Sequence, residues 1–522
     1  MRSRSVVFLL SATAALAACG QANQASSAAS TPAAPPRSCA ELATLAMPHT
    51  TLGTETVAAG AFQSPQPPFP GFAADFTKLP DFCRVRGSIT PSADSDIRFE
   101  LWLPAQNWNG KFLQTGNGGA AGSIVYASLA EPLARGYAVA NTDTGHQGDG
   151  GDFAWAADHP EKLTDYQYRA VHELTLVGKG LTAARYGKQP TKSYWNGCST
   201  GGRQGLKEAQ RYPADYDAIV AGAPASNWSA LMASSILAQR TLTSPGGLGV
   251  DKLGMLKEAA IAACDAQDGV TDRVIGRPAG CTFEPASLQC RAGKTAACLT
   301  AAEVAAAKRI YAGVVNKAGD VLMPGTGPGS EPLWGAYASP QFSIGTSYFR
   351  NVVARDQSWA PASFDVDADV ARIEAQDAGA AKAMDPDLSA FVARGGKLLT
   401  YHGTTDGLIP YGNSVNYYNS VVAKLGAEKT KDSVALYLVP SMDHCAGGEG
   451  AFAVDWLGAL EAWDATGKPP ATILGTHPPA PAGTPQSSAK SFTRPVCPYP
   501  QLPKYTGAGD EADAANWRCA AE

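Results

Sequence analysis

The strongest chemical signal in the sequence is a serine flanked by glycines. Residues 197–201 read Gly-Cys-Ser-Thr-Gly, which has the G-x-S-x-G form of a sharp turn that exposes a nucleophilic serine. A strand-like stretch, 193–196, precedes it, and a helix is predicted from Gly202. The glycines permit the cramped turn, and the start of a helix favours developing negative charge. The pentapeptide alone also occurs by chance, but in this context it predicts that Ser199 is a nucleophile.

A nucleophilic serine needs a base to accept its proton and a carboxylate to orient that base. Asp406 lies in a polar loop after the strand predicted at 397–401, and His444 lies in the loop after the strand predicted at 433–439. The order serine, aspartate, histidine along the chain is that of α/β-hydrolases. We therefore predict a catalytic triad of Ser199, His444 and Asp406.

Other interpretations of these side chains remain open. Asp406 precedes Gly407 and also fits a turn-forming aspartate. His444 also fits a histidine of a surface loop. Asp443 is a rival acid, although the direct neighbour of His444 cannot easily reach behind its imidazole.

A glycine-rich loop is a candidate for the oxyanion hole. Such a hole needs a second backbone N–H besides that of Thr200. The loop Gly116–Gly119 follows the strand predicted at 112–115 and offers N–H groups with little steric hindrance. We favour Gly119 over Gly118 as the donor; a plain glycine-rich turn is the alternative.

Two cysteines neighbour the proposed catalytic residues. Cys198 directly precedes Ser199, and Cys445 directly follows His444. If the serine and the histidine touch, their neighbours are also close, and a Cys198–Cys445 disulfide would join the two loops. Chain-entropy models give such a cross-link about 5 kcal/mol as an upper figure. A catalytic Cys198 is the poorer alternative, because exported cysteines are usually oxidised and the turn aims its central residue at the substrate.

Alternating strands and helices must position these residues. The sequence predicts a doubly wound α/β sheet, in which loops at the carboxyl ends of strands carry the chemistry. The stretch 225–385 breaks the alternation and is interpreted as an inserted cap. The predicted strands are 97–103, 112–115, 137–141, 193–196, 218–221, 397–401 and 433–439, with helices at 165–186 and 203–211. The predicted segments are a signal peptide (1–18), a tether (19–37), the core (38–224 and 386–522) and the cap (225–385).

The N-terminal segment is typical of a bacterial lipoprotein signal. Arg2 and Arg4 precede the apolar run 6–10, and the small-residue stretch after it ends at Cys19. In that class the cysteine is lipidated, so Cys19 would anchor the chain to a membrane surface without spanning it. Gly20 after the cysteine favours the outer membrane. An ordinary cleaved signal with a nearby cysteine is the alternative.

Composition limits the other classes of function. The net charge of −5 and the absence of a basic patch argue against a nucleic-acid partner. Ten of the eleven cysteines remain after Cys19, an even number that predicts disulfides in an oxidising compartment. No CxxC pair occurs and the seven histidines are scattered, so no cysteine or histidine spacing predicts a tetrahedral zinc site. No obligate protein partner is evident.

With these motifs, the chain resembles the tannase and feruloyl esterase family, which includes mono(2-hydroxyethyl) terephthalate hydrolase. The family's hallmark is a disulfide between a cysteine beside the catalytic serine and one beside the catalytic histidine. The resemblance covers about 39–519 and implies an α/β-hydrolase fold with a large inserted cap. It also implies four more disulfides. The matching residues are the loop 116–119, Asn-Thr-Asp-Thr-Gly-His at 141–146, the segment 197–202, Asp406, His444 and Cys445, and the implied pairs are Cys39–Cys83, Cys264–Cys281, Cys290–Cys298 and Cys497–Cys519.

The resemblance also implies a structural calcium ion in the cap segment 264–274. Several hard oxygen ligands close in sequence, with a glycine that lets the loop fold round the ion, suit Ca²⁺. A solvated acidic turn is the alternative. Arg273 stands where family members often have glycine. The implied ligands are the side chains of Asp265, Asp268 and Asp272 and the carbonyls of Val270 and Val274.

The activity implied by the resemblance is hydrolysis of aromatic-acid esters: feruloyl and other hydroxycinnamoyl, galloyl or terephthalate-type. No organic cofactor is implied. An amidase or peptidase would use the same triad, and a non-catalytic binding lipoprotein on a hydrolase scaffold is a further alternative. Aromatic cap residues either pack on the acyl ring of the substrate or form the core of the cap: Trp334, Tyr337, Tyr348, Phe349 and Trp359.

Overall fold

The structure is a computed structural model, and it describes residues 35–66, 74–148, 150–291, 297–479 and 490–521. The predicted signal peptide and Cys19 lie outside the described residues. Within the described ranges, no helix combines the length and the apolar character needed to cross a bilayer.

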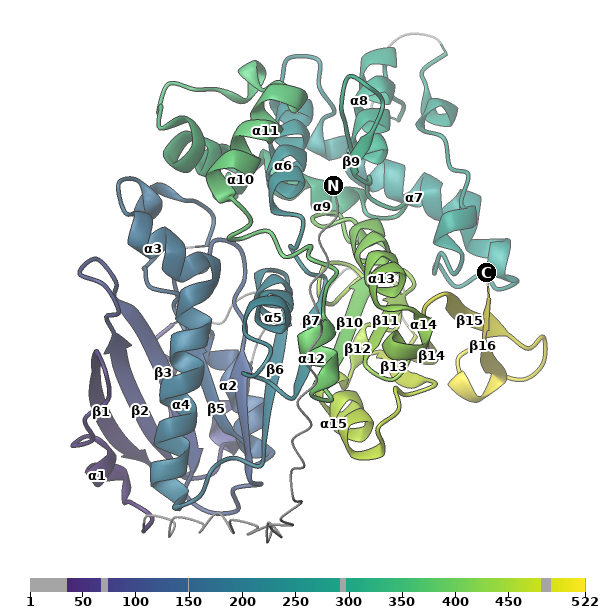
Figure 1. Cartoon of the computed structure of the whole chain (residues 1–522). Coiled ribbons are helices and arrows are strands. Elements are labelled where there is room, and N and C mark those ends of the chain that lie inside the picture. Colours follow the sequence, from purple (N-terminus) through teal and green to yellow (C-terminus); the bar gives the residue numbers. More distant parts are fainter. Residues whose placement is uncertain (1–34, 67–73, 149, 292–296, 480–489, 522) are drawn as a thin grey trace, which may run out of the picture.

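A mixed twelve-stranded sheet runs through the described part of the chain (Figure 1). Six neighbouring strands at its centre are parallel, in the order β5-β4-β6-β7-β10-β11. Antiparallel strands extend the sheet on both sides, in the orders β1-β2-β3 and β14-β13-β12. The central strands are β4 (Lys111–Thr115), β5 (Ala138–Thr142), β6 (Lys192–Cys198), β7 (Ala218–Gly222), β10 (Lys397–Gly403) and β11 (Val434–Val439). The flanking strands are β1 (Thr50–Val57), β2 (Phe82–Ile89), β3 (Ile97–Pro104), β12 (Ala453–Val454), β13 (Ile473–His477) and β14 (Phe492–Pro498).

Helices cover both faces of the sheet, so the central strands are buried on both sides. Every residue of β5, β7 and β11 is buried, as expected for parallel strands rich in Val, Ala, Ile and Leu. One apolar core lies between the sheet and α4, α5, α12 and α13; the other lies between the sheet and α2 and α15. This is the predicted α/β class. These helices are α2 (Tyr126–Ala134), α4 (Ala170–Tyr186), α5 (Thr200–Arg211), α12 (Ser389–Ala393), α13 (Tyr411–Leu425) and α15 (Trp456–Thr466).

The segment between β7 and β10 leaves the main sheet and returns to it, because these two strands are neighbours. Apart from α12, its helices lie together above the sheet (Figure 1) and enclose apolar clusters of their own. It leaves β7 at the edge of the sheet where the parallel strands have their carboxyl ends, and it enters β10 at the opposite edge. It contains α6 (Trp228–Thr243), α7 (Leu253–Cys264), α8 (Ala301–Ala312), α9 (Glu331–Trp334), α10 (Ile344–Tyr348), α11 (Val366–Asp377) and the hairpin β8 (Val314–Val315) and β9 (Val321–Met323).

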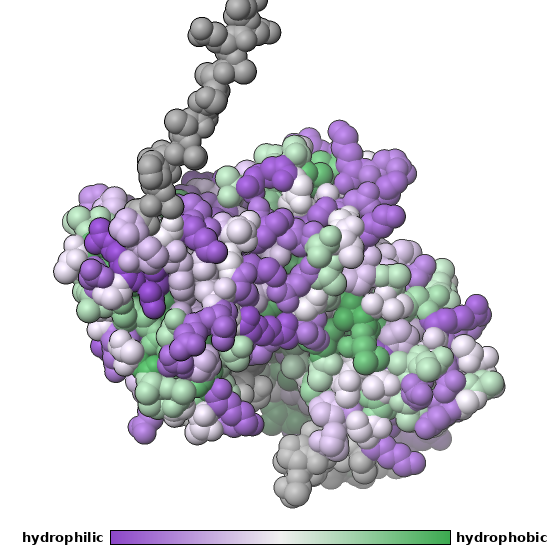
Figure 2. Space-filling model, turned by 90° about the horizontal axis from the view of Figure 1, so that it is seen from below, coloured by the Kyte–Doolittle hydropathy of each residue, from purple (hydrophilic) through white to green (hydrophobic). Residues whose placement is uncertain are grey.

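Short elements complete the described chain, and all five predicted disulfides form. A surface view from below shows hydrophilic and hydrophobic side chains interspersed (Figure 2). The remaining elements are α1 (Cys39–Leu42), α3 (Pro160–Thr164), α14 (Ala427–Thr430) and the hairpin β15 (Gln501–Tyr505) and β16 (Trp517–Ala521). The disulfides are Cys39–Cys83, Cys198–Cys445, Cys264–Cys281, Cys290–Cys298 and Cys497–Cys519.

Candidate active site

Ser199 occupies the sharp turn between β6 and α5. Its backbone angles, φ 63° and ψ −122°, are unfavourable for a residue with a side chain, and such strain is found at functional turns. The turn is tightly packed: a Cβ on Gly197 would lie 2.7 Å from the carbonyl of Gly201, and one on Gly202 would lie 2.2 Å from the oxygen of Gly222. The glycines are therefore required by close approach of backbone to backbone.

Asp406 and His444 form a hydrogen-bonded pair at the ends of β10 and β11. Nδ1 of His444 donates to Oδ2 of Asp406 over 2.7 Å. The other carboxylate oxygen of Asp406 accepts from the backbone N–H groups of Leu408 and Ile409, each at 2.9 Å. With its proton on Nδ1, the imidazole keeps the lone pair of Nε2 for another group.

Electrostatics hold this pair in the protonation states that base catalysis needs. Burial disfavours the charged form of Asp406, but the charge of His444 and hydrogen bonds from His402 and His444 outweigh burial and hold the pKa of the carboxyl well below its usual range. Burial also opposes the charged form of His444, yet the charge of Asp406 and its hydrogen bond prevail and raise the pKa of the imidazole. The carboxylate therefore stays ionised while the imidazole is able to accept a proton.

The rival acid Asp443 faces a different group. Its Oδ1 accepts from Oγ1 of Thr405 at 2.8 Å, and no hydrogen bond found among the described residues joins it to the imidazole of His444. Burial raises the pKa of Asp443 to about 6. Of the two carboxylates, Asp406 is the one that orients the histidine.

A second histidine contacts Asp406, and the sequence did not predict it. His402 is fully buried at the end of β10, and its Nε2 lies 3.2 Å from Oδ2 of Asp406 and 2.8 Å from the carbonyl oxygen of Ile409. Both partners are acceptors, so Nε2 carries the hydrogen. Oγ of Ser414 lies 2.8 Å from Nδ1 on the other side of the ring. Spacing gave no signal for this role, because it depends on how the loop after β10 folds back and brings Asp406 and Ile409 to His402.

The disulfide Cys198–Cys445 joins the serine turn to the histidine loop. The two Cα atoms are 6.0 Å apart, although 247 positions separate them in sequence. Ser199 and His444 are the direct neighbours of these half-cystines, so the bond brings the predicted nucleophile and base to the same place. Because its sulfur is bonded, Cys198 has no free thiol to act as a nucleophile.

The glycine loop lies against the start of α5. The carbonyl of Asn117 accepts from the N–H of Gly201 at 2.8 Å, and Oγ1 of Thr200 donates to the carbonyl of Gly119 at 2.6 Å. The N–H of Thr200, as the first residue of the helix, has no partner within it. A Cβ added to Gly118 would meet nothing within 4 Å, so this part of the loop is open. Thr200, Gly118 and Gly119 are thus close together, and the geometry leaves the choice between the glycines open.

The predicted calcium ligands lie in the turn after α7. Asp265 is 5% exposed and Asp268 9%, and Gly269 takes the left-handed conformation, φ 97°, that turns the chain back. Burial, followed by repulsion from Asp272 and Asp265, raises the pKa of Asp268 to about 6. A hard cation would relieve this crowding of carboxylates, so the donor set fits Ca²⁺. One oxygen of Asp272 already pairs with Arg494 at 2.5 Å.

Arg273 occupies a left-handed position in the same loop, with φ 74°. Its guanidinium bonds both carboxylate oxygens of Glu258, at 2.9 and 2.7 Å, and approaches Glu449 at 3.3 Å. Nearby, the N–H of Ile275 donates to Oγ of Ser441 at 2.8 Å. The acidic loop is therefore connected directly to the loop that carries His444.

The aromatic cap residues pack within two apolar clusters. Trp334, Tyr348 and Phe349 are fully buried, and the rings of Phe349 and Trp359 lie 4.3 Å apart between centroids. Tyr337 is 4% exposed and donates its hydroxyl hydrogen to the carbonyl of Leu408. These side chains form the core of the cap, which was the alternative interpretation.

Comparison with known proteins shows the family of the chain. The family model described as tannase and feruloyl esterase matches residues 83–520. The chain belongs to this family. An uncharacterized esterase of Xanthomonas campestris pv. campestris is 36% identical, with 92% of this chain and 91% of that protein aligned. A probable feruloyl esterase B-1 of Aspergillus flavus is 35% identical over 84% of this chain and 86% of its own length.

A solved structure supports the same assignment. The crystal structure of feruloyl esterase B from Aspergillus oryzae has a TM-score of 0.82, 30% sequence identity, and coverage of 92% of this chain and 100% of that one. This tannase and feruloyl esterase family member therefore has the α/β-hydrolase fold and is a carboxylic ester hydrolase. Its five disulfides indicate folding in an oxidising compartment.

Proposed function

We propose that this family member hydrolyses esters of aromatic carboxylic acids through a covalent acyl-enzyme formed on Ser199. The observation that carries the proposal is the Asp406–His444 hydrogen bond of 2.7 Å, held by a disulfide beside a strained serine turn. The names of the relatives point to a feruloyl or other hydroxycinnamoyl ester, and galloyl and terephthalate-type esters belong to the same chemical class.

Each residue of the triad has a defined task in this mechanism. Oγ of Ser199 attacks the ester carbonyl while Nε2 of His444 accepts its proton. His444 then protonates the leaving alcohol, and Asp406 fixes the imidazole tautomer and stabilises its charged form. Water then attacks the acyl-enzyme while His444 accepts its proton. His444 returns that proton to Oγ of Ser199 as the carboxylic acid leaves.

Backbone N–H groups stabilise the tetrahedral intermediate. The N–H of Thr200 at the start of α5 donates to the oxyanion, together with an N–H of the loop that contains Gly118 and Gly119. Removal of one such donor typically costs about 10²–10³ in kcat. Gly119 remains our preferred second donor, and Gly118 is its competitor.

Hydrolysis of an ester panel by the purified enzyme and by Ser199→Ala tests the proposal. The panel contains methyl gallate, methyl ferulate, chlorogenate, mono(2-hydroxyethyl) terephthalate and an aliphatic nitrophenyl ester. We expect activity on one aromatic class and a loss on the order of 10⁶ in kcat in the variant. Activity that survives Ser199→Ala would refute the triad, and a folded enzyme that cleaves only amides would favour the amidase alternative.

We further propose that the cap loop binds a structural Ca²⁺ through Asp265, Asp268 and Asp272 and the carbonyls of Val270 and Val274. Calcium at 100 times its Kd adds about 2.7 kcal/mol to the free energy of unfolding. The melting temperature should therefore rise with calcium in the wild type and not in Asp268→Asn. A calcium effect of equal size in both proteins would exclude this loop as the site.

A further inference from the structure

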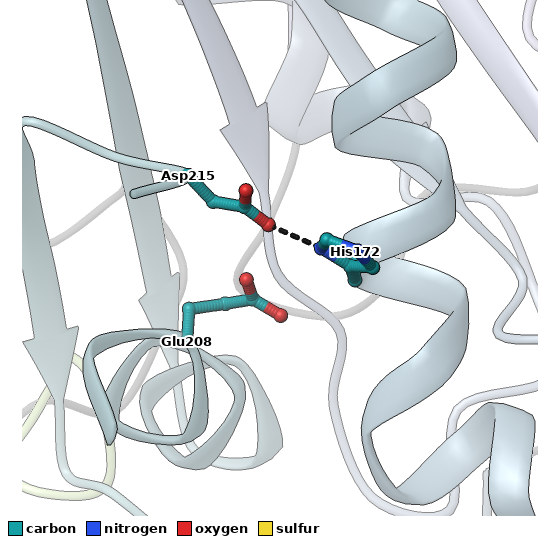
Figure 3. A group of neighbouring side chains, drawn as sticks. All are labelled: His172, Glu208 and Asp215. Carbon is teal, nitrogen blue, oxygen red and sulfur yellow. Dashed lines mark hydrogen bonds and ion pairs between the residues drawn. The ribbon is translucent and has the colours of Figure 1, made fainter. Parts of the chain in front are cut away.

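Three metal-ligating side chains from separate segments meet on the face of the sheet that α4 and α5 cover (Figure 3). His172 lies on α4, Glu208 on α5, and Asp215 in the loop between α5 and β7. One ligand atom from each lies within 4.8 Å of the other two, and Nδ1 of His172 is 2.6 Å from Oδ2 of Asp215. The spacing along the sequence gave no sign of this group, because 36 and 7 positions separate its members.

One carboxylate oxygen of Glu208 is unsatisfied in this group. Its side chain points toward the other two (Figure 3) and is 1% exposed, and its Oε2 has no hydrogen-bond partner among the residues that the structure describes. A buried carboxylate without a partner is costly, since removal from water is not compensated. Glu208 and Asp215 are both acceptors when ionised, so the space between them requires a shared proton or a cation.

No hydrogen bond found among the described residues joins a fourth side chain to the carboxylates of Glu208 and Asp215. The ammonium of Lys179 bonds the backbone carbonyl of Asp215, not its carboxylate. The ring of Tyr212 stacks on His172 with 3.8 Å between centroids, which fixes the plane of the imidazole. The side chain of His172 is 23% exposed and that of Asp215 8%, so the histidine edge offers an approach from solvent.

We propose that His172, Glu208 and Asp215 bind one divalent cation of the zinc class. One imidazole nitrogen and two carboxylate oxygens are a ligand set that Zn²⁺ accepts, with water in the fourth position, whereas Ca²⁺ and Mg²⁺ prefer oxygen alone. Bonds of about 2.0–2.2 Å place tetrahedral ligands roughly 3.3 Å apart. Small side-chain rotations bring the present group to that spacing.

The ion would act as a structural link, not as part of the reaction. Glu208 is nine residues beyond Ser199, which directly precedes α5, and nine residues of helix correspond to about 13 Å. The ion would fasten α4 to the helix that begins at the nucleophile and to the loop before β7. This site is distinct from the acidic loop of the cap.

Metal titration of the chelator-treated enzyme tests the proposal. We expect one Zn²⁺ per chain by calorimetry, and a Co²⁺ spectrum with the intense visible bands of tetrahedral coordination. Glu208→Gln keeps the shape of the side chain and should weaken Zn²⁺ binding at least tenfold, as should His172→Ala. Asp268→Asn and Ser199→Ala are matched controls that should bind Zn²⁺ like the wild type, with calcium absent from the titration.

Two results would overturn the proposal. One is no saturable Zn²⁺ binding by the folded wild type, which would leave a shared proton between Glu208 and Asp215. The other is undiminished binding in Glu208→Gln, which would move the ion to a different place. X-ray absorption of the Zn²⁺-loaded wild type gives the ligand set without a mutation, and anything other than a single imidazole among nitrogen and oxygen ligands counts against the site.

Discussion

At the scale of single residues, the state of His444 sets the pH dependence of the enzyme. The base works only when neutral, so activity falls as the pH falls through its pKa. Asp406 raises that pKa above the ordinary value near 6.5. We expect the acidic limb of kcat/KM to lie above pH 6.5.

Asp406→Asn should shift this limb to lower pH, because it removes the negative charge that raises the pKa of His444. It should also lower kcat by about 10⁴, since the amide favours the wrong imidazole tautomer. Profiles of kcat/KM against pH for both proteins provide the test. An acidic limb that does not move in the variant would contradict the assignment of Asp406 as the partner of His444.

His402 is predicted to be a positioning residue that acts through Asp406. His402→Phe removes the donor to Asp406 and keeps a ring in the buried space, so we expect kcat to fall about 10- to 100-fold at constant KM, the range of a hydrogen bond to a charged group. His402→Gln retains an N–H donor and should recover part of this loss. Equal losses in both variants, or a change confined to the melting temperature, would indicate a purely structural role.

At the scale of elements, the sequence predicted the parts of the sheet that position the site. β4, β6, β7, β10 and β11 were predicted within a few residues, because runs of buried apolar residues mark parallel strands. The flanking strands were largely missed: the exposed side of β1, for example, carries threonine and glutamate, and its pairing depends on distant partners.

The sequence predicted those residues of the candidate site that lie in a recognisable motif or in a loop directly after a predicted strand. Ser199, Asp406 and His444 each follow a strand, and their cysteine neighbours added a distance restraint. His402 and the His172, Glu208 and Asp215 group were missed, because only tertiary packing brings their partners together. The boundaries of the cap, 225–385, stay a prediction.

The disulfide between the two catalytic loops should matter for both stability and rate. Its closed loop of 247 positions gives about 5 kcal/mol in the chain-entropy model, against about 2.5 kcal/mol for the 8-position loop of Cys290–Cys298. We expect the double serine variant of Cys198 and Cys445 to lose more unfolding free energy than the matched variant of Cys290 and Cys298. Only the first should also lose kcat. Denaturant unfolding and ester hydrolysis measure the two effects, and equal losses would argue against a clamp on the site.

At the scale of the whole molecule, the first described helix and the reactive edge lie at opposite ends. α1, which begins at Cys39, lies far from the cap helices (Figure 1). The catalytic loops follow the carboxyl ends of the parallel strands, on the cap side. A predicted tether of residues 19–37 would span about 24 Å as a flexible coil. A lipid at Cys19 would therefore be attached through a flexible segment that enters the described chain far from the active site.

This arrangement predicts that anchoring and catalysis are separable. In a bacterial host, we expect the full chain to incorporate labelled fatty acid and to partition with membranes, because acyl chains bury many CH₂ groups in the bilayer. Cys19→Ser should abolish labelling, while kcat and KM toward a soluble aromatic ester stay unchanged. Fractionation and kinetics of both proteins test this. A variant that still partitions with membranes would assign the attachment to another surface, and a loss of kcat would show that the N-terminal segment contributes to the active site.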